Sequence, residues 1–108
     1  MTVEIRSRPV QTRREVIERL RALEPEIRAF HATGLYLFGS AARDELGPDS
    51  DVDLFVDYDV NGAFSFVELL DLPQFLGDRL GRKVELCTRA GLHPKLKERI
   101  ERSAIKVL

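Results

Sequence analysis

Five aspartates gather in one short segment of the chain, LYLFGSAARDELGPDSDVDLFVDYD, which covers residues 35–59. They are Asp49, Asp51, Asp53, Asp57 and Asp59. Clustered carboxylates repel one another and lose hydration when they are buried, so they belong either on a solvated surface or where a cation is bound. Side chains alternate across a strand, and a strand over residues 51–57 places Asp51 and Asp53 side by side on one face. Such a pair of carboxylates is suited to binding a metal ion.

A solvated strand face is the alternative to a metal site, because period-two alternation is typical of half-buried strands. The residue type favours a cation, since aspartate has a poor strand propensity and a pair of them lowers stability when nothing offsets the charge. A calcium-binding EF-hand loop is excluded. Its sixth position requires glycine and its twelfth requires glutamate, whereas a loop starting at Asp49 has Leu54 and Val60 there.

A glycine and a serine, Gly39 and Ser40, follow the apolar residues 35–38, which are expected to form a strand covered on both faces. A helix that starts at this point directs free backbone amides at an anion, and a glycine lets a phosphate approach the backbone. Magnesium is usually held by one or two carboxylates together with the phosphates of the substrate. The Gly-Ser turn and the aspartate pair therefore predict together a site for a metal-bound nucleoside triphosphate.

Hydrophobic periodicity predicts helices and strands in alternation along the chain. The expected helices are 12–24, a second short helix opened by Pro25 and ended by Gly34, 41–45, a helical region over 65–81, and 94–102. The expected strands are 35–38, 51–57, 83–88 and 104–108. This order predicts an α/β (α+β) fold in a single domain over residues 1–108, with a small mixed sheet of about four strands and helices packed on it.

Short local signals set the expected boundaries of these elements. Capping boxes start helices at Thr12 and at Ser65, each with a glutamate three residues later. Ser40 is expected to cap the short helix that follows the first strand. In the helical region over 65–81, Pro73 is expected to interrupt the helix and Gly81 to close it.

The overall charge and hydropathy of the chain narrow the classes of function. Seventeen Lys and Arg residues stand against 18 Asp and Glu residues, for a net charge of -1. The basic surface typical of an autonomous nucleic-acid-binding protein is missing, so no direct nucleic acid binding is expected. No apolar run approaches the roughly 20 residues of a membrane span. We therefore expect a cytoplasmic protein that makes no contact with a membrane.

The Gly39-Ser40 pair followed by Asp51-x-Asp53 resembles the signature of the nucleotidyltransferase superfamily that includes DNA polymerase beta. The fuller run LFGSAARDE...SDVDLFVDYD is similar to that of the minimal nucleotidyltransferases, and the strand KVELCT and the ending GLHPKLKERIERSAIKVL sit where that family has corresponding parts. The resemblance covers nearly the whole chain. It implies the small palm-like fold of polymerase beta, with ATP as substrate and two magnesium ions as cofactors.

The resemblance also implies a role for individual residues. On the triphosphate side it assigns Gly39, Ser40 and Arg43, and on the metal side Asp51, Asp53 and Glu85. Two positions depart from the family pattern. Glu85 stands where the family usually has aspartate, and its extra methylene shifts a ligand of a metal that tolerates little geometric error. Asp44 stands where the family usually has glycine, and its charge opposes triphosphate binding unless its side chain points away.

The minimal proteins of this kind are similar to antitoxins whose partner is a helical HEPN ribonuclease toxin. The resemblance therefore implies transfer of AMP from ATP to a tyrosine hydroxyl of such a toxin, in a homo- or hetero-oligomer. Two other functions stay open: a fold that neutralises its partner by binding alone, and a small-molecule nucleotidyltransferase that works with a separate acceptor-binding chain. His31, His93 and Cys87 are expected to have structural or surface roles, with Cys87 a small buried apolar residue.

Overall fold

The fold is built on one mixed sheet of four strands in the order β3-β2-β1-β4. The computed structural model describes residues 8–108 of the chain. Its strands are β1 (Ala32–Phe38), β2 (Val52–Tyr58), β3 (Val84–Thr88) and β4 (Ile105–Lys106). β1 runs antiparallel to both β2 and β4, whereas β2 and β3 are parallel. The predicted mixed α/β architecture with about four strands is confirmed.

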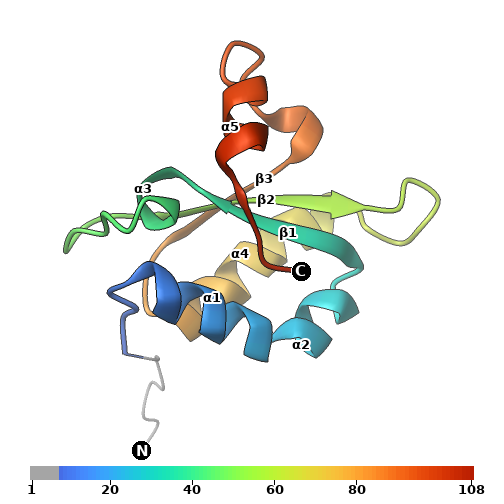
Figure 1. Ribbon diagram of the computed structural model, residues 1–108. Helices are drawn as coiled ribbons and strands as arrows, with labels where there is room; N and C mark the ends of the chain where they lie inside the picture. The colour runs from blue at the N-terminus through green and yellow to red at the C-terminus, as the bar shows by residue number, and fades with distance from the viewer. Residues whose placement is uncertain (1–7) are drawn as a thin grey trace, which may run out of the picture.

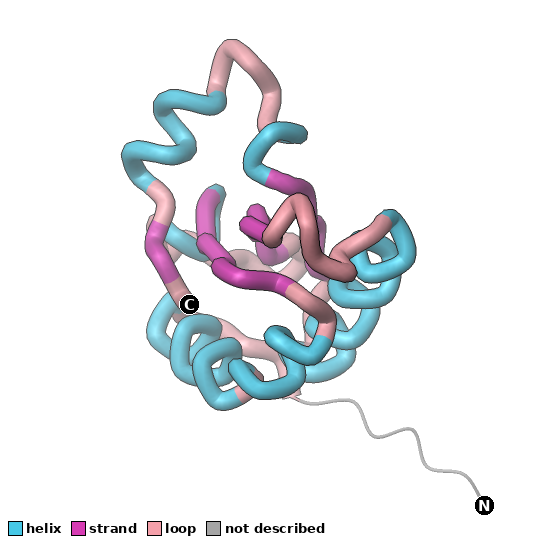
Figure 2. Tube along the Cα trace, turned by 90° about the vertical axis from the view of Figure 1, so that its right-hand side faces the viewer, coloured by secondary structure: helices cyan, strands magenta, loops and turns pink. Residues whose placement is uncertain are grey.

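The helices divide between the two faces of the sheet. They are α1 (Arg13–Ala22), α2 (Glu24–Ala29), α3 (Gly39–Ala42), α4 (Phe66–Leu80) and α5 (Lys97–Ser103), with a short 3-10 helix η1 (Arg89–Gly91) after β3. Helices α1, α2 and α4 cover one face, and η1 and α5 stand on the other, as Figure 1 and the side view of Figure 2 show. No helix within residues 8–108 is both long and apolar enough to cross a membrane.

The hydrophobic core lies between the sheet and helices α1, α2 and α4. Val52, Leu54 and Val56 alternate along β2 and are fully buried on this side, where they meet the fully buried Leu72 and Leu76 of α4. The alternation leaves the other face of β2 to Asp53 and Asp57 and to an aromatic side chain. Core packing therefore determines which face carries the carboxylates, because a shift of one residue would bury them.

Several boundaries follow the predicted local signals. The Thr12 side chain accepts a hydrogen bond from the amide of Glu15 at the start of α1, and Ser65 and Glu68 form the predicted capping box at the start of α4. Gly81 ends α4 in the left-handed conformation, at φ 69°. These contacts join residues three or four apart, so sequence alone determines them.

Three predictions made from a single glycine, serine or proline are wrong. Gly34 does not end the second helix: α2 stops at Ala29, His31 takes the left-handed conformation at φ 70°, and Gly34 lies inside β1 where the pairing with β2 shifts register. Ser40 does not cap α3, because the backbone already turns at Gly39 and the N-cap is Phe38.

The third wrong prediction concerns Pro73, which lies inside a continuous α4 instead of interrupting it. A proline removes one backbone hydrogen bond from a helix interior. Leu72, Leu76 and Leu80 are all fully buried, so one apolar face packs on the sheet on both sides of the proline. Burial of that continuous face offsets the missing hydrogen bond.

Residues 89–104, from η1 to the C-cap of α5, form an arm. β3 and β4 form opposite edges of the sheet, so the chain that joins them has to cross the sheet. The arm crosses on the face that α1, α2 and α4 leave open (Figure 1). Its helix and the strand after it are shorter than predicted, since α5 begins at Lys97 and β4 ends at Lys106. The arm therefore stands on the face that carries the aspartates.

Candidate functional site

Two carboxylates meet on the open face because β2 and β3 are parallel and in register. Asp53 of β2 is the direct neighbour of Glu85 of β3 in the strand pairing. Asp51 comes directly before β2 and, like Asp53, is partly buried, whereas Glu85 is exposed. The structure thus brings together the predicted carboxylates, which lie up to 34 residues apart in the sequence numbering (85 minus 51).

Asp53 is the electrostatic centre of this group. Burial, followed by repulsion from Glu85 and from Asp51, raises the pKa of Asp53 from its ordinary value of 3.8 to about 6. Arg43 acts in the opposite direction and is the nearby positive charge that lowers the pKa. A cation placed among these carboxylates would favour the ionised form in the same way, and more strongly.

Gly39 is needed where the turn after β1 passes Asp53. The residue before it, Phe38, pairs with Asp53 across β1 and β2, and Gly39 itself has a left-handed φ of 73°. A Cβ atom built on Gly39 would lie 3.2 Å from Cγ of Asp53 and still closer to one of its carboxylate oxygens. A larger residue would be strained and would push against the carboxylate. Glycine therefore lets the start of α3 and the carboxylate group approach each other.

The other two residues expected on the triphosphate side lie on and directly after α3. Ser40 is the second residue of α3 and is partly exposed. Arg43 follows α3, is exposed, and makes a long ion pair of 3.4 Å with Glu45. Such an exposed pair contributes little to stability, so the guanidinium can turn to another anion at small cost.

A pocket of about 340 Å³ opens beside the carboxylates, lined by Phe38, Asp53, Glu85, Leu86 and Cys87. Cys87 is half-buried rather than fully buried, and burial and the nearby Asp53 raise the pKa of its thiol. The prediction of Cys87 as a buried apolar residue missed this place in the pocket wall. Its spacing of two from Glu85 on one strand is the signal that places both side chains on the same face.

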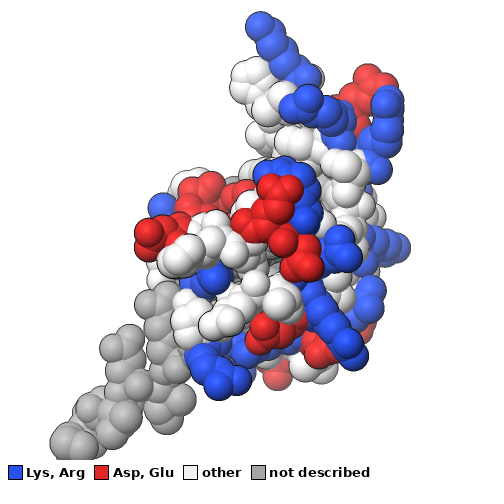
Figure 3. Space-filling view, turned by 60° about the vertical axis from the view of Figure 1, so that its left-hand side comes forward, with Lys and Arg blue, Asp and Glu red and all other residues white. Residues whose placement is uncertain are grey.

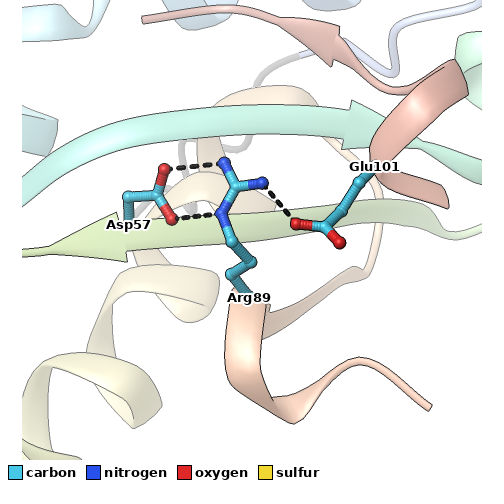
Figure 4. Close-up of polar contacts among 3 residues, drawn as sticks. All are labelled: Asp57, Arg89 and Glu101. Carbon is cyan, nitrogen blue, oxygen red and sulfur yellow. Dashed lines mark hydrogen bonds and ion pairs between the residues drawn. The ribbon is translucent and has the colours of Figure 1, made fainter. Parts of the chain in front are cut away.

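Two other aspartates of the cluster, Asp57 and Asp59, have structural partners. Asp57 accepts two hydrogen bonds from Arg89, at 2.9 and 2.8 Å, and a third nitrogen-to-oxygen contact of 2.7 Å joins Arg89 to Glu101 of α5 (Figure 4). Arg89 thereby keeps the pKa of Asp57 below its ordinary value. Asp59 accepts a hydrogen bond from the amide of Asn61 in the turn after β2. Arg89 had no assigned role in the sequence prediction.

Asp44, the residue that departs from the family pattern, is held away from the carboxylate group. Its Oδ1 atom accepts a hydrogen bond of 2.8 Å from the amide of Arg13 in the first turn of α1. The Arg13 side chain returns a bond of 3.3 Å to the carbonyl of Ala42. Asp44 has a left-handed φ of 59°, which aspartate tolerates better than most residues. Its charge is therefore directed at the N-terminus of α1, where it is stabilising.

The donor set fits magnesium that arrives with a triphosphate. Within residues 8–108, no three His, Cys, Asp or Glu side chains already surround a cation position. Asp51, Asp53 and Glu85 supply hard oxygen donors on one side only, and magnesium commonly takes its remaining ligands from water and substrate phosphates. Acidic side chains gather near α3, and Lys and Arg side chains project from the arm above them (Figure 3). An open, one-sided acidic site of this kind suits a metal–phosphate complex better than a permanent structural metal.

Comparison with known proteins agrees with this geometry. Residues 13–107 match the family described as nucleotidyltransferase domain. A Methanocaldococcus jannaschii protein assigned as a protein adenylyltransferase is 40% identical over 79 residues, which cover 72% of this chain and 79% of that protein. The chain belongs to the nucleotidyltransferase domain family.

Solved structures show the same relationship. A structure described as a minimal nucleotidyltransferase superposes with a TM-score of 0.65 at 33% identity and covers 82% of this chain and 93% of its own. A toxin-antitoxin crystal structure with AMP-PNP gives a TM-score of 0.64 at 18% identity and covers 82% of this chain and 72% of that one. At that identity the second likeness shows the fold alone.

Proposed function

We propose that this chain is a metal-dependent protein adenylyltransferase that transfers AMP from ATP to a hydroxyl group of a partner protein. The observation that carries the proposal is the close approach of Gly39, at the start of α3, to Asp53, the strand neighbour of Glu85. The approach puts backbone amides suited to phosphate beside carboxylates suited to magnesium. The 40% identity to a protein assigned as an adenylyltransferase supports AMP as the transferred group.

The reaction is an in-line displacement at the α-phosphorus of ATP. A bond forms between the acceptor oxygen and the α-phosphorus, the bond between the α-phosphorus and the bridging oxygen to the β-phosphorus breaks, and pyrophosphate leaves while the acceptor proton passes to solvent. Bound magnesium supplies charge neutralisation and lowers the pKa of the acceptor hydroxyl.

The protein's own residues position these groups. Asp51, Asp53 and Glu85 would hold the metal side. The backbone amides of Gly39 and Ser40 would donate hydrogen bonds to the phosphate oxygens, and the Arg43 guanidinium would orient the phosphates by a fork of hydrogen bonds. Positioning and electrostatic stabilisation are the main sources of rate in this chemistry. The raised pKa of Asp53 fits this role, because burial and the neighbouring carboxylates disfavour its ionised form and a bound cation would favour it.

The partner we propose is a HEPN-type ribonuclease toxin, with a tyrosine as the acceptor and this chain as the antitoxin. The resemblance to minimal nucleotidyltransferases implies such a pair, and the toxin-antitoxin structure with the same fold supports it. A second function, neutralisation by binding alone, is favoured by one observation. Glu85 is longer than the usual aspartate, is exposed, and makes a 3.8 Å ion pair with Lys83 that competes with a metal for its carboxylate.

Mass spectrometry of the partner separates the two functions. The chain is incubated in catalytic amount with excess partner, ATP and magnesium, and an enzyme should add AMP, about 329 Da for each transfer by metal-assisted displacement. The Asp53→Asn variant should abolish the addition. The matched control is Asp49→Asn, because Asp49 is exposed in the preceding loop and lies outside the carboxylate group.

The adenylyltransferase proposal is contradicted if inhibition of the partner follows mass action. Inhibition at one copy per partner, independent of ATP and unchanged by Asp53→Asn, would show that this chain neutralises its partner by contact.

A further inference from the structure

The arm, residues 89–104, is a braced element that stands on the face of the sheet that carries Asp53 (Figure 1). Arg89 forms the brace at its base: the guanidinium lies 4.8 Å from the ring centre of Tyr36 on β1 and 4.9 Å from that of Phe55 on β2. From this position Arg89 binds Asp57 of the sheet and Glu101 of α5 at the same time (Figure 4). The arm is thus tied to the sheet at a defined place and rises from the face that carries Asp53.

The outer part of the arm carries positive charge that the arm itself does not neutralise. The two glutamates of α5 are engaged, Glu101 by Arg89 and Glu98 by Arg102 at 2.6 Å. Lys95 and Arg99 are exposed, lie four residues apart, and within residues 8–108 make no ion pair. Lys95 lies in the turn that precedes α5 and Arg99 lies on α5 itself, and both side chains line the same hollow.

These side chains form a small receptive surface. A shallow hollow of about 230 Å³ is lined by Lys95, Glu98, Arg99 and Arg102, so three of its four lining residues are basic. The adjacent Leu96 is 42% exposed and adds an apolar contact. Basic side chains at the tip of the arm are visible at the top of Figure 3.

We infer that the arm is a docking surface for an acidic segment of the protein acceptor, with a carboxylate of that segment bound between Lys95 and Arg99. This inference rests on the proposed function in one respect, namely that the docked protein is the acceptor. An acceptor held on the arm lies on the same face of the sheet as Asp53 and Glu85, so docking there raises the local concentration of its hydroxyl at the site.

Charge and composition favour a protein over a nucleic acid as the occupant. Residues 89–104 contain no Phe, Tyr or Trp, the side chains on which single-stranded bases stack. The carboxylates below the arm and the net charge of -1 also repel a long phosphate backbone. A short acidic peptide segment needs only a local basic surface, which the hollow provides.

Fluorescence anisotropy with two labelled probes tests the inference. The first probe is a short peptide with a central tyrosine flanked by glutamates, and the second is a single-stranded RNA of the same net charge, both at low ionic strength so that surface charges are not screened. Binding is measured for the wild-type chain, for Lys95→Glu/Arg99→Glu, and for Arg14→Glu/Arg79→Glu. The last variant makes the same change in net charge on α1 and α4, at the opposite face of the sheet.

We expect the wild-type chain to bind the peptide more tightly than the RNA. The arm variant should weaken peptide binding about tenfold, the effect expected of reversing two interfacial charges, while the control variant changes it less than about twofold. Absence of peptide binding, equal loss in both variants, or tighter arm-dependent binding of the RNA would overturn the inference. Neither ATP nor transfer enters this assay, so failure of the proposed enzymatic function would leave its result readable.

Discussion

Replacing Asp53 by asparagine is expected to raise the free energy of unfolding and to abolish binding of ATP with magnesium. The pKa of Asp53 rises from 3.8 to about 6 on folding, and each unit corresponds to about 1.36 kcal/mol. Ionised Asp53 therefore lowers the free energy of unfolding by about 3 kcal/mol as an upper bound. The side chain is partly exposed, so solvent screening reduces the expected gain for Asp53→Asn to about 1–2 kcal/mol at neutral pH. For a domain of this size the melting temperature should rise by about 5–10 °C.

The gain should depend on pH in a defined direction. A carboxylate whose pKa is raised on folding binds its proton more tightly in the folded state, so the protein loses stability as the carboxylate ionises. For the wild-type chain this loss of stability develops between about pH 4 and about pH 6, which are the pKa values of Asp53 in the unfolded and the folded state. Asparagine does not titrate. The stabilities of the two proteins should therefore converge below about pH 4 and differ fully above about pH 6.

Thermal and denaturant unfolding at a series of pH values measure this difference. Asp49→Asn is the matched control and should leave stability nearly unchanged, because Asp49 lies in an exposed loop. Magnesium with ATP should stabilise the wild-type chain and not Asp53→Asn, since mass action stabilises only a state that binds. An Asp53→Asn variant that melts at or below the wild-type temperature at neutral pH would refute the reasoning, because Asp53 would then be a structural residue.

The remaining predictions concern three other residues. Gly39→Ala should lower stability by about 1–3 kcal/mol and abolish ATP-dependent thermal stabilisation, because φ at this position is positive and Asp53 leaves no space for a Cβ atom. Gly47→Ala is the control and should do neither, because a Cβ atom there meets nothing closer than 3.5 Å. Arg89→Ala should cost about 2–3 kcal/mol in denaturant unfolding through loss of two charged partners, and full stability would contradict the bracing role. Asp44→Ala should lose about 1–2 kcal/mol, because it removes the cap on Arg13 and keeps a Cβ at the left-handed φ of 59°, whereas Asp44→Asn, which keeps the acceptor, should stay near the wild-type value in the same measurement.

Features governed by short contacts could be predicted from the sequence. Thr12, Ser65 and Gly81 mark helix ends through hydrogen bonds or backbone conformations that involve residues at most four apart. The alternation along β2 likewise follows from strand geometry, so the shared face of Asp53 and Asp57 needed no tertiary information. The wrong predictions at Gly34 and Pro73 have the opposite origin, because strand pairing and the burial of α4 overrode the local preference.

The arrangement and the electrostatics of the carboxylate site depend on contacts between distant segments of the chain. The sequence alone determined which residues carry oxygen donors and which glycine can take a left-handed turn. Only the parallel register of β2 and β3 placed Glu85 beside Asp53. Burial of Asp53 in the folded chain, followed by repulsion from Glu85, raises the pKa of Asp53. Only the arm brought Arg89 to Asp57, 32 residues away. The physical reason is that local preferences act within one or two turns of chain, whereas the pKa of a carboxylate depends on every charge and apolar surface that folding brings near it.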